Sequence, residues 1–379
     1  MTALPYPSHI RPLTSLRFVA AIWVLLYHFK DHLGFDLGRI GLVGDGYLGV
    51  DLFFTLSGFI LAHVYLSEIE SGRFHYFDFL RNRLARIYPL HLVGLGAMLA
   101  LFFGAVAAGV SVGQPDAFKL KDIPAHLALV HAWGATMAVG WNFPSWSISA
   151  EWAAYLQFPV IAFIVLKTNQ PRFMLLWSLA LCLFSFVALD QLHQLFRHVG
   201  REYAQMTAQI GALRIMPSFF MGVSLYAFGR RFAAPARAAW PIALASLFWI
   251  IFVATTGLWD GLVWFGFAGL IYGLAETARH GADAPAAGPR FVFLGAASYA
   301  LYMLHLPVDI VWFHAMERLG VDENAPVLMR AAVWIGVFIA SVGVSALAYV
   351  WVEEPARRWV RNVRLPAPSS QAQSARSQA

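Results

Sequence analysis

The chain has 379 residues, of which 59% are hydrophobic and only 13% are charged. Soluble domains carry about 25% charged residues, so this composition excludes an ordinary water-soluble enzyme, a disordered protein and a secreted disulfide scaffold. It predicts a polytopic helical membrane protein. The single cysteine, Cys182, has no partner within the chain for a disulfide or a zinc cluster. The net charge of +6 fits an excess of Lys and Arg in cytoplasmic loops, and we expect no nucleic-acid partner.

Ten apolar segments are each long enough to cross a bilayer. They cover residues 14–33, 47–67, 88–110, 149–167, 173–190, 211–228, 239–256, 260–276, 291–316 and 329–351. With the N-terminus inside, the inside segments hold 17 Lys and Arg residues, whereas the outside segments hold 6. Cytoplasmic loops are enriched in these residues. We therefore predict an all-α fold with about ten transmembrane helices and both termini in the cytoplasm.

Three segments outside these spans have distinct compositions. Residues 74–87 are amphipathic and basic, which is typical of a helix lying in the inner membrane interface. Residues 111–148 form the longest outside segment, and we expect their apolar centre, 126–139, to fold back into the protein. The Pro-, Ser- and Gln-rich end predicts a disordered cytoplasmic tail over 359–379, after a membrane domain over 1–358.

The first span contains two ionisable residues, Arg17 and His28. Eleven residues of α-helix place them about 20° apart around the axis and about 16 Å apart in depth. A buried charge costs about 2.5–3.5 kcal/mol on insertion scales, so such residues indicate either function or a specific helix contact. Imidazole has the pKa required of a general base near neutral pH.

The second span carries Asp51 near its outer end and the small residues Gly46, Gly49 and Gly58. The glycines predict close helix packing. Asp51 either orients His28 through a hydrogen bond or caps its own helix. Ser57 is a conceivable nucleophile, but no Gly-x-Ser-x-Gly elbow surrounds it, so packing is the preferred interpretation.

Arg83 and Arg86 are three residues apart and share one face of a helix. Guanidinium groups bind phosphate oxygens in a bidentate manner, so this pair suits either a phosphorylated ligand or lipid headgroups. Further along, Glu151 begins the fourth span, with Tyr155 one turn later. Glu151 is either a favourable first-turn acid or a carboxylate that points into a cavity.

The ninth span contains a polar stripe on an otherwise apolar helix. Its members recur at helical spacing: Ser298, Tyr302, His305 and Asp309. The stripe lines either a cavity or a polar contact between helices. In the last span Glu354 precedes Pro355, which we expect to mark the end of the helix.

Taken in order, these motifs resemble those of the acyltransferase-3 family of integral membrane O-acyltransferases. The family's motifs match Arg17 with His28, residues 49–59, Arg83 with Arg86 and Pro89, residues 146–151, residues 298–307 and residues 353–357. The matches extend over nearly the whole chain. One departure is Trp152, which stands where the family usually has a second acidic residue after Glu151.

The resemblance implies acyl transfer from cytoplasmic acyl-CoA to a hydroxyl, often on a sugar of an envelope or exported polysaccharide. It also implies that His28 is the general base and that Arg17, Arg83 and Arg86 hold the anionic donor. Acetyl-CoA is the expected co-substrate, with no permanently bound cofactor and no metal. The expected partners are acyl-CoA, a carbohydrate or lipid-linked glycan acceptor and the lipid bilayer, and the expected location is the bacterial inner membrane.

Besides the donor-binding set of Arg17, Arg83 and Arg86, we therefore predict two further sets of site residues. The candidate catalytic residues are His28, Arg17, Asp51 and Glu151, and the candidate cavity-lining residues are Ser298, Tyr302, His305 and Asp309. Transfer is either direct or through an acyl-enzyme, for which His28 is a candidate carrier. The alternative function is a transporter of a small anionic or sugar-like solute, because such carriers also place ionisable residues on inward faces.

Overall fold

The computed structural model describes residues 4–110, 118–136, 140–198, 203–282 and 287–362. Within these ranges the chain is helical and contains no strand. The helices are α1 (Arg11–Phe29), α2 (Gly41–Gly44), α3 (Gly49–Glu70), α4 (Tyr76–Ala107), α5 (Ile123–Leu127), α6 (Trp146–Thr168), α7 (Pro171–His198), α8 (Tyr203–Arg231), α9 (Ala236–Thr256), α10 (Val263–Arg279), α11 (Pro289–Arg318), α12 (Val327–Ala348) and α13 (Glu354–Asn362).

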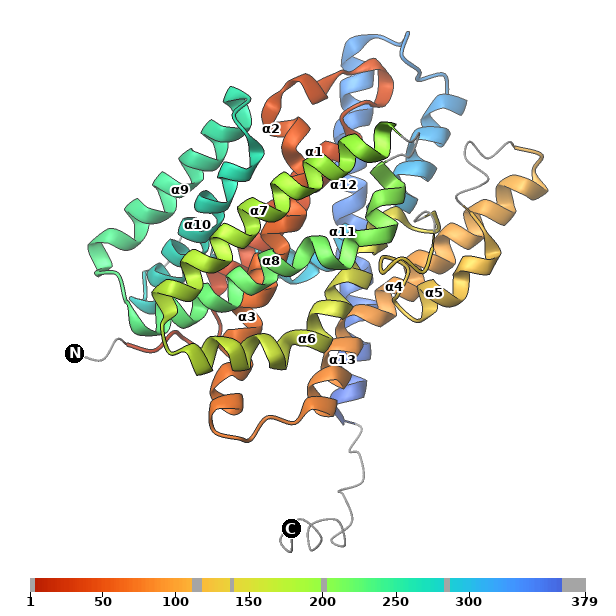
Figure 1. Ribbon diagram of the computed structural model, residues 1–379. Helices are drawn as coiled ribbons and strands as arrows, with labels where there is room; N and C mark the ends of the chain where they lie inside the picture. The colour runs from red at the N-terminus through yellow and green to blue at the C-terminus, as the bar shows by residue number, and fades with distance from the viewer. Residues whose placement is uncertain (1–3, 111–117, 137–139, 199–202, 283–286, 363–379) are drawn as a thin grey trace, which may run out of the picture.

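Within the described ranges, ten helical segments are long and apolar enough to cross a membrane, which confirms the all-α fold with about ten candidate transmembrane helices. The cytoplasmic location of both termini stays a prediction. In Figure 1, the α3–α4 connection and α13 lie at the bottom of the bundle, whereas the connections after α1 and between α11 and α12 lie at the top. Helices α1, α4 and α11 therefore run through the bundle in one direction, and α3 runs in the opposite direction. This arrangement brings the start of α1, the start of α4 and the start of α11 to the same side.

Glycine residues allow the closest helix contacts, as the sequence predicted. A Cβ atom on Gly58 would lie 2.1 Å from the backbone oxygen of Phe219, and one on Gly222 would lie 2.1 Å from that of Thr55. Only glycine permits α3 and α8 to approach this closely. Gly46 makes a similar approach to α1, where a Cβ atom would lie 2.3 Å from the Trp23 oxygen.

The basic segment 74–87 does not form a separate helix. Residues from Tyr76 onward belong to α4, which continues past Pro89 into the apolar span. The reason is that Arg83 and Arg86 face a cavity inside the bundle, so this segment is held by the protein and is continuous with the helix that enters it.

The described parts of the 111–148 connection fold into the protein, as expected. His126, Leu129, His131 and Ala132 are buried, and the Ala132 oxygen accepts a hydrogen bond of 3.0 Å from the backbone of Ala212. The imidazoles of His126 and His131 stack with centroids 4.0 Å apart. Burial lowers the pKa of His126 to about 3, and burial next to other imidazoles lowers the pKa of His131 well below its usual value.

The end of the last span differs from the expectation in one respect. The helix does not stop at Pro355, because a π-helical turn over Tyr349–Glu353 joins α12 to α13. A π turn shifts the hydrogen-bond register, and Pro355 then occupies the first turn of α13, where a missing N–H costs nothing. Helix α13 reaches Asn362, so residues 359–362 of the predicted tail are helical, and residues 363–379 lie outside the described ranges.

Candidate active site

A cavity lies between α1, α3, α4, α6 and α11. Its lining is Arg17, Val50, Phe53, Phe54, Ser57, Ile60, Leu61, Arg83, Arg86, Ser147, Ile148, Glu151, Tyr155, Ser298, Tyr299 and Tyr302. The apolar members come mostly from α3, and the charged ones come from α1, α4 and α6. One wall thus suits a hydrocarbon chain, and the facing wall suits an anion.

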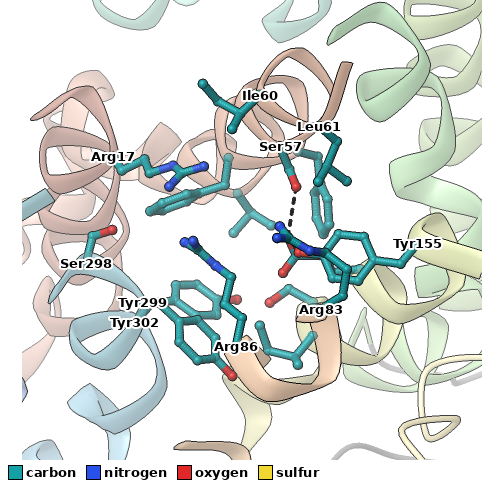
Figure 2. A pocket seen from close by; sticks show the side chains of 16 residues that line it. Arg17, Ser57, Ile60, Leu61, Arg83, Arg86, Tyr155, Ser298, Tyr299 and Tyr302 are labelled. Atoms are coloured by element: carbon teal, nitrogen blue, oxygen red, sulfur yellow. Dashed lines mark hydrogen bonds between the residues drawn. The ribbon is translucent and has the colours of Figure 1, made fainter. Parts of the chain in front are cut away.

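Three arginines that are distant in the sequence meet in this cavity. Figure 2 shows Arg17, Arg83 and Arg86 directing their guanidinium groups into the same space. The Nε atom of Arg83 is buried and has no hydrogen-bond partner within the described part of the protein. Such a donor is available to a ligand, and three clustered guanidinium groups favour phosphate or carboxylate oxygens.

Glu151 is the carboxylate that faces this cluster from α6. Its Oε1 accepts hydrogen bonds from the Ser57 hydroxyl at 2.9 Å and from the Tyr155 hydroxyl at 2.5 Å. The first of these bonds is drawn in Figure 2. Of the two interpretations left open by the sequence, the structure shows the carboxylate in the cavity. Ser57 and Tyr155 fix its position, so that it acts on the arginines as an ordered negative charge.

A second buried carboxylate, Glu353, lies behind the arginines. Its side chain is fully buried, and its charge acts on Arg86, Arg357 and Arg17. Sequence reasoning did not assign it a role, because its position before Pro355 suggested the end of a helix. Burial of an acid two residues before that proline follows from the continuation of the helix into α13.

His28 lies beyond the cavity wall, near the C-terminal end of α1. Its ring contacts those of His305, at a centroid distance of 4.7 Å, and Phe143, at 6.3 Å. The His305 ring is in turn 6.0 Å from that of Tyr302, which lines the cavity. Tyr302 and His305 therefore connect His28 to the cavity.

The hydrogen bonds of His305 leave one nitrogen without a partner among the described residues. Its Nδ1 lies 2.7 Å from the backbone oxygen of Tyr302, to which an N–H there donates. With the proton on Nδ1, the Nε2 atom carries a lone pair, and this atom is buried with no hydrogen-bond partner. An accepting nitrogen is thus held in the ring that contacts His28.

The predicted polar stripe on α11 divides between different contacts. Ser298 and Tyr302 line the cavity, and His305 meets His28. Asp309 instead pairs with His32, at 2.9 Å between Oδ1 and Nε2. One helix face therefore runs from the arginine cavity, past the two imidazoles, to an acid at the opposite end of the bundle.

Asp51 has a different partner from the one considered in the sequence analysis. Its Oδ2 accepts a hydrogen bond of 3.0 Å from the Arg214 guanidinium on α8, and both side chains are buried. The Arg214 guanidinium also lies 5.0 Å from the ring centre of Trp146. The carboxylate does not cap α3; it connects α3 to α8. Sequence reasoning missed Arg214, although a charged residue within an apolar span was the available signal.

Metal ligation has no support in the described residues. No group of three or more His, Cys, Asp or Glu side chains there could hold a metal ion. The buried imidazoles of His91, His126 and His131 are nearly parallel. Stacked rings present their faces to one another, whereas ligation requires that their nitrogens converge on one point.

The fold and the site define the class of protein. In the described part of the chain, a bundle of ten membrane-length helices encloses a cavity with an arginine-lined wall and an apolar wall, and an imidazole pair lies beside it. Comparison with known families identifies the class: residues 12–350 match the acyltransferase-3 model, described as an acyltransferase domain. The chain belongs to this family and is an integral membrane enzyme that transfers acyl groups.

Two of three similar proteins are named as acyltransferases. "Acyltransferase MdmB" of Streptomyces mycarofaciens is 33% identical over 44% of this chain and 43% of its own length. A Staphylococcus aureus protein named "Putative O-acetyltransferase" is 25% identical over 92% of this chain and 58% of its own length. "Protein 2 in picA locus" of Rhizobium radiobacter is 32% identical over 41% of this chain and 81% of its own length. The chain thus spans about half the length of the two named acyltransferases. No solved structure matches it significantly.

Proposed function

We propose that this enzyme transfers an acyl group, with acetyl as the first candidate, from cytoplasmic acyl-CoA to a hydroxyl of a carbohydrate or other envelope acceptor. The observation that carries the proposal is the cavity in which Arg17, Arg83 and Arg86 face an apolar wall. Acyl-CoA combines phosphate groups with an uncharged pantetheine arm, so it matches both walls. The relatives' names support O-acyl transfer, and family membership favours it over transport.

The donor enters from the cytoplasm in this scheme, since the excess of Lys and Arg predicts that the termini and the start of α4 are inside. Arg17 is six residues into α1 from that side. All three arginines are then accessible to cytoplasmic acyl-CoA, while His28 lies nearer the opposite face. In bacteria this membrane is the cytoplasmic one, which is the inner membrane where the cell also has an outer one.

The chemical step requires a base, an acyl carbon and a leaving thiolate. His28 accepts the proton of the acceptor hydroxyl, and the hydroxyl oxygen forms a bond to the thioester carbonyl carbon. The carbon–sulfur bond then breaks, and the CoA thiolate takes up the proton from the His28 imidazolium. The negative charge on the carbonyl oxygen requires a hydrogen-bond donor close to His28, and Arg17, about 16 Å away along α1, holds the anionic end of the acyl donor instead. The Tyr302 hydroxyl is not available as that hydrogen-bond donor, because it donates to the Pro144 oxygen at 3.0 Å.

The roles of Glu151 and Asp51 in this scheme are to position other groups. Glu151 orders the arginines in the cavity, and Asp51 fixes α3, which supplies the apolar wall, against α8. The experiment that tests the function measures CoA release and acetylated glycans with the wild type and with His28→Ala. We expect a loss of about 10²–10⁴-fold, the usual contribution of a general base. Wild-type activity in His28→Ala would contradict the assignment.

A further inference from the structure

Two further hollows adjoin the arginine cavity near the start of α4. The nearer one is lined by Tyr65, Asn82, Arg83, Ala85, Arg86 and Arg357. The outer one is lined by Tyr65, Glu68, Arg73, His75, Asp78, Phe79 and Asn82. The cavity and the nearer hollow share Arg83 and Arg86, and the two hollows share Tyr65 and Asn82. The shared residues place the nearer hollow beside the cavity and the outer hollow beside the nearer one, at the end of the bundle at which α4 begins.

The nearer hollow has a strongly positive lining. It presents three guanidinium groups and the amide of Asn82, and no carboxylate is among the described residues that line it. Arg357 comes from α13, where its Nη1 lies 3.7 Å from both the Glu353 and Glu354 carboxylates. These ion pairs hold the guanidinium in place at the wall of the hollow. Because guanidinium groups bind phosphate oxygens well, three of them around one space suit an anion with more than one negative charge.

The outer hollow has a different character. It carries Arg73 and His75, but also the carboxylates Glu68 and Asp78. Two carboxylates disfavour a pyrophosphate here, whereas they can accept hydrogen bonds from an amino group of a base. Arg73 supplies a cation for a single phosphate on the same ligand. Tyr65 stands at the junction, with its hydroxyl 3.4 Å from Arg83 Nη2.

We infer that Arg357 and Asn82, together with Arg83 and Arg86, form a pyrophosphate subsite for the nucleotide end of the donor, with the phosphorylated nucleoside in the outer hollow. The inference rests on the proposed use of acyl-CoA and assigns a place to the half of the donor that does not react. Helix α13, which continues the last helix beyond Pro355 through a π turn, carries Arg357 at this hollow.

The test measures binding of CoA, adenosine 3′,5′-bisphosphate and pantetheine to the purified full-length protein by calorimetry. We expect Arg357→Gln to raise the Kd for CoA and for the bisphosphate about tenfold, and Asn82→Ala to raise it about threefold, as the loss of charge-assisted contacts predicts. The matched control is Arg358→Gln, because Arg358 is exposed on the same helix and pairs with Glu354 at 2.9 Å. It should bind all three ligands as the wild type does.

The outcomes separate this inference from the proposed function. If Arg357→Gln and Asn82→Ala both bind CoA as tightly as Arg358→Gln, the subsite is refuted, whether or not the protein transfers acetyl groups. If binding depends on Arg357 but no acyl group is transferred from acetyl-CoA, the subsite stands and the proposed function fails. If Arg357 is required for binding phosphatidylglycerol vesicles but not the nucleotide, the hollow is a lipid headgroup site and the inference is overturned.

Discussion

The imidazoles of His28 on α1 and His305 on α11 lie 4.7 Å apart, centroid to centroid, although they come from distant parts of the chain. His305 is held through Nδ1 by the Tyr302 carbonyl, and its Nε2 has no partner in the described protein. The proposed base therefore has a second imidazole beside it with an accepting nitrogen. This arrangement suggests that His305 positions the His28 ring.

Replacement of His305 tests this positioning role. We expect His305→Ala and His305→Asn to lower kcat about 10–100-fold while the KM for acetyl-CoA stays within about twofold, since neither restores Nε2. His314→Ala is the control, because that residue is exposed on the same helix. A change in KM alone, or full activity of the Asn variant, would contradict the role.

Asp51 and Arg214 form a buried ion pair, and each should stabilise the folded protein by neutralising the charge of the other. Removing one partner leaves an unpaired buried charge, so Asp51→Ala or Arg214→Ala should each lower the free energy of unfolding by about 3–5 kcal/mol. The double variant should lose less than the sum of the two. Unfolding in mixed detergent micelles measures this cycle, and additive losses would show that the two residues act independently.

Gly58 should not tolerate a side chain. In Gly58→Ala the new Cβ atom would meet the Phe219 oxygen at 2.1 Å, so α3 and α8 must separate. We expect a loss of about 1–3 kcal/mol in the free energy of unfolding. Gly96→Ala is the matched control, since nothing described lies within 4 Å of the position that its Cβ atom would take. Equal stability of the two variants would show that close packing at Gly58 is unimportant.

The buried histidines outside the spans predict sensitivity to acid. The pKa of His126 is lowered to about 3 in the folded protein, whereas it is about 6.5 in an unfolded chain. As the pH falls, the unfolded state therefore binds the proton first. Neutral His126 makes its full contribution to the free energy of unfolding above about pH 6.5. That contribution decreases as the pH drops toward 3. For one histidine, the free energy of unfolding changes by at most about 1.4 kcal/mol per pH unit.

Thermal unfolding between pH 7 and pH 4 checks this expectation. The wild type should lose stability steadily over this range, and His126→Phe, which keeps an aromatic ring in the stack, should lose less. His314→Phe serves as the control at an exposed position. An unchanged pH slope in His126→Phe would show that the acid response arises elsewhere.

Much of the fold follows from local properties of the sequence. Apolar runs of about 20 residues predict spanning helices wherever they occur, because every backbone polar group must be satisfied within the membrane. The helical spacing of Arg17 with His28 and of Ser298 with Tyr302 likewise requires only the geometry of a single helix. These properties predicted ten spans, the glycine-rich contact face and the charged members of the cavity.

Tertiary packing decided how these faces meet. The sequence by itself placed an acid at position 51 and an imidazole at position 28, but only the approach of α8 to α3 gives Asp51 the partner Arg214. In the same way, the sequence predicted that the last helix ends at Pro355, whereas the helix continues through a π turn into α13 and its Arg357 lines the nearer hollow. Pairing of this kind depends on which helices are neighbours and on their rotation about their axes. Hydrophobic periodicity shows that a helix has a buried face, but it carries no information about which residue on another helix faces it.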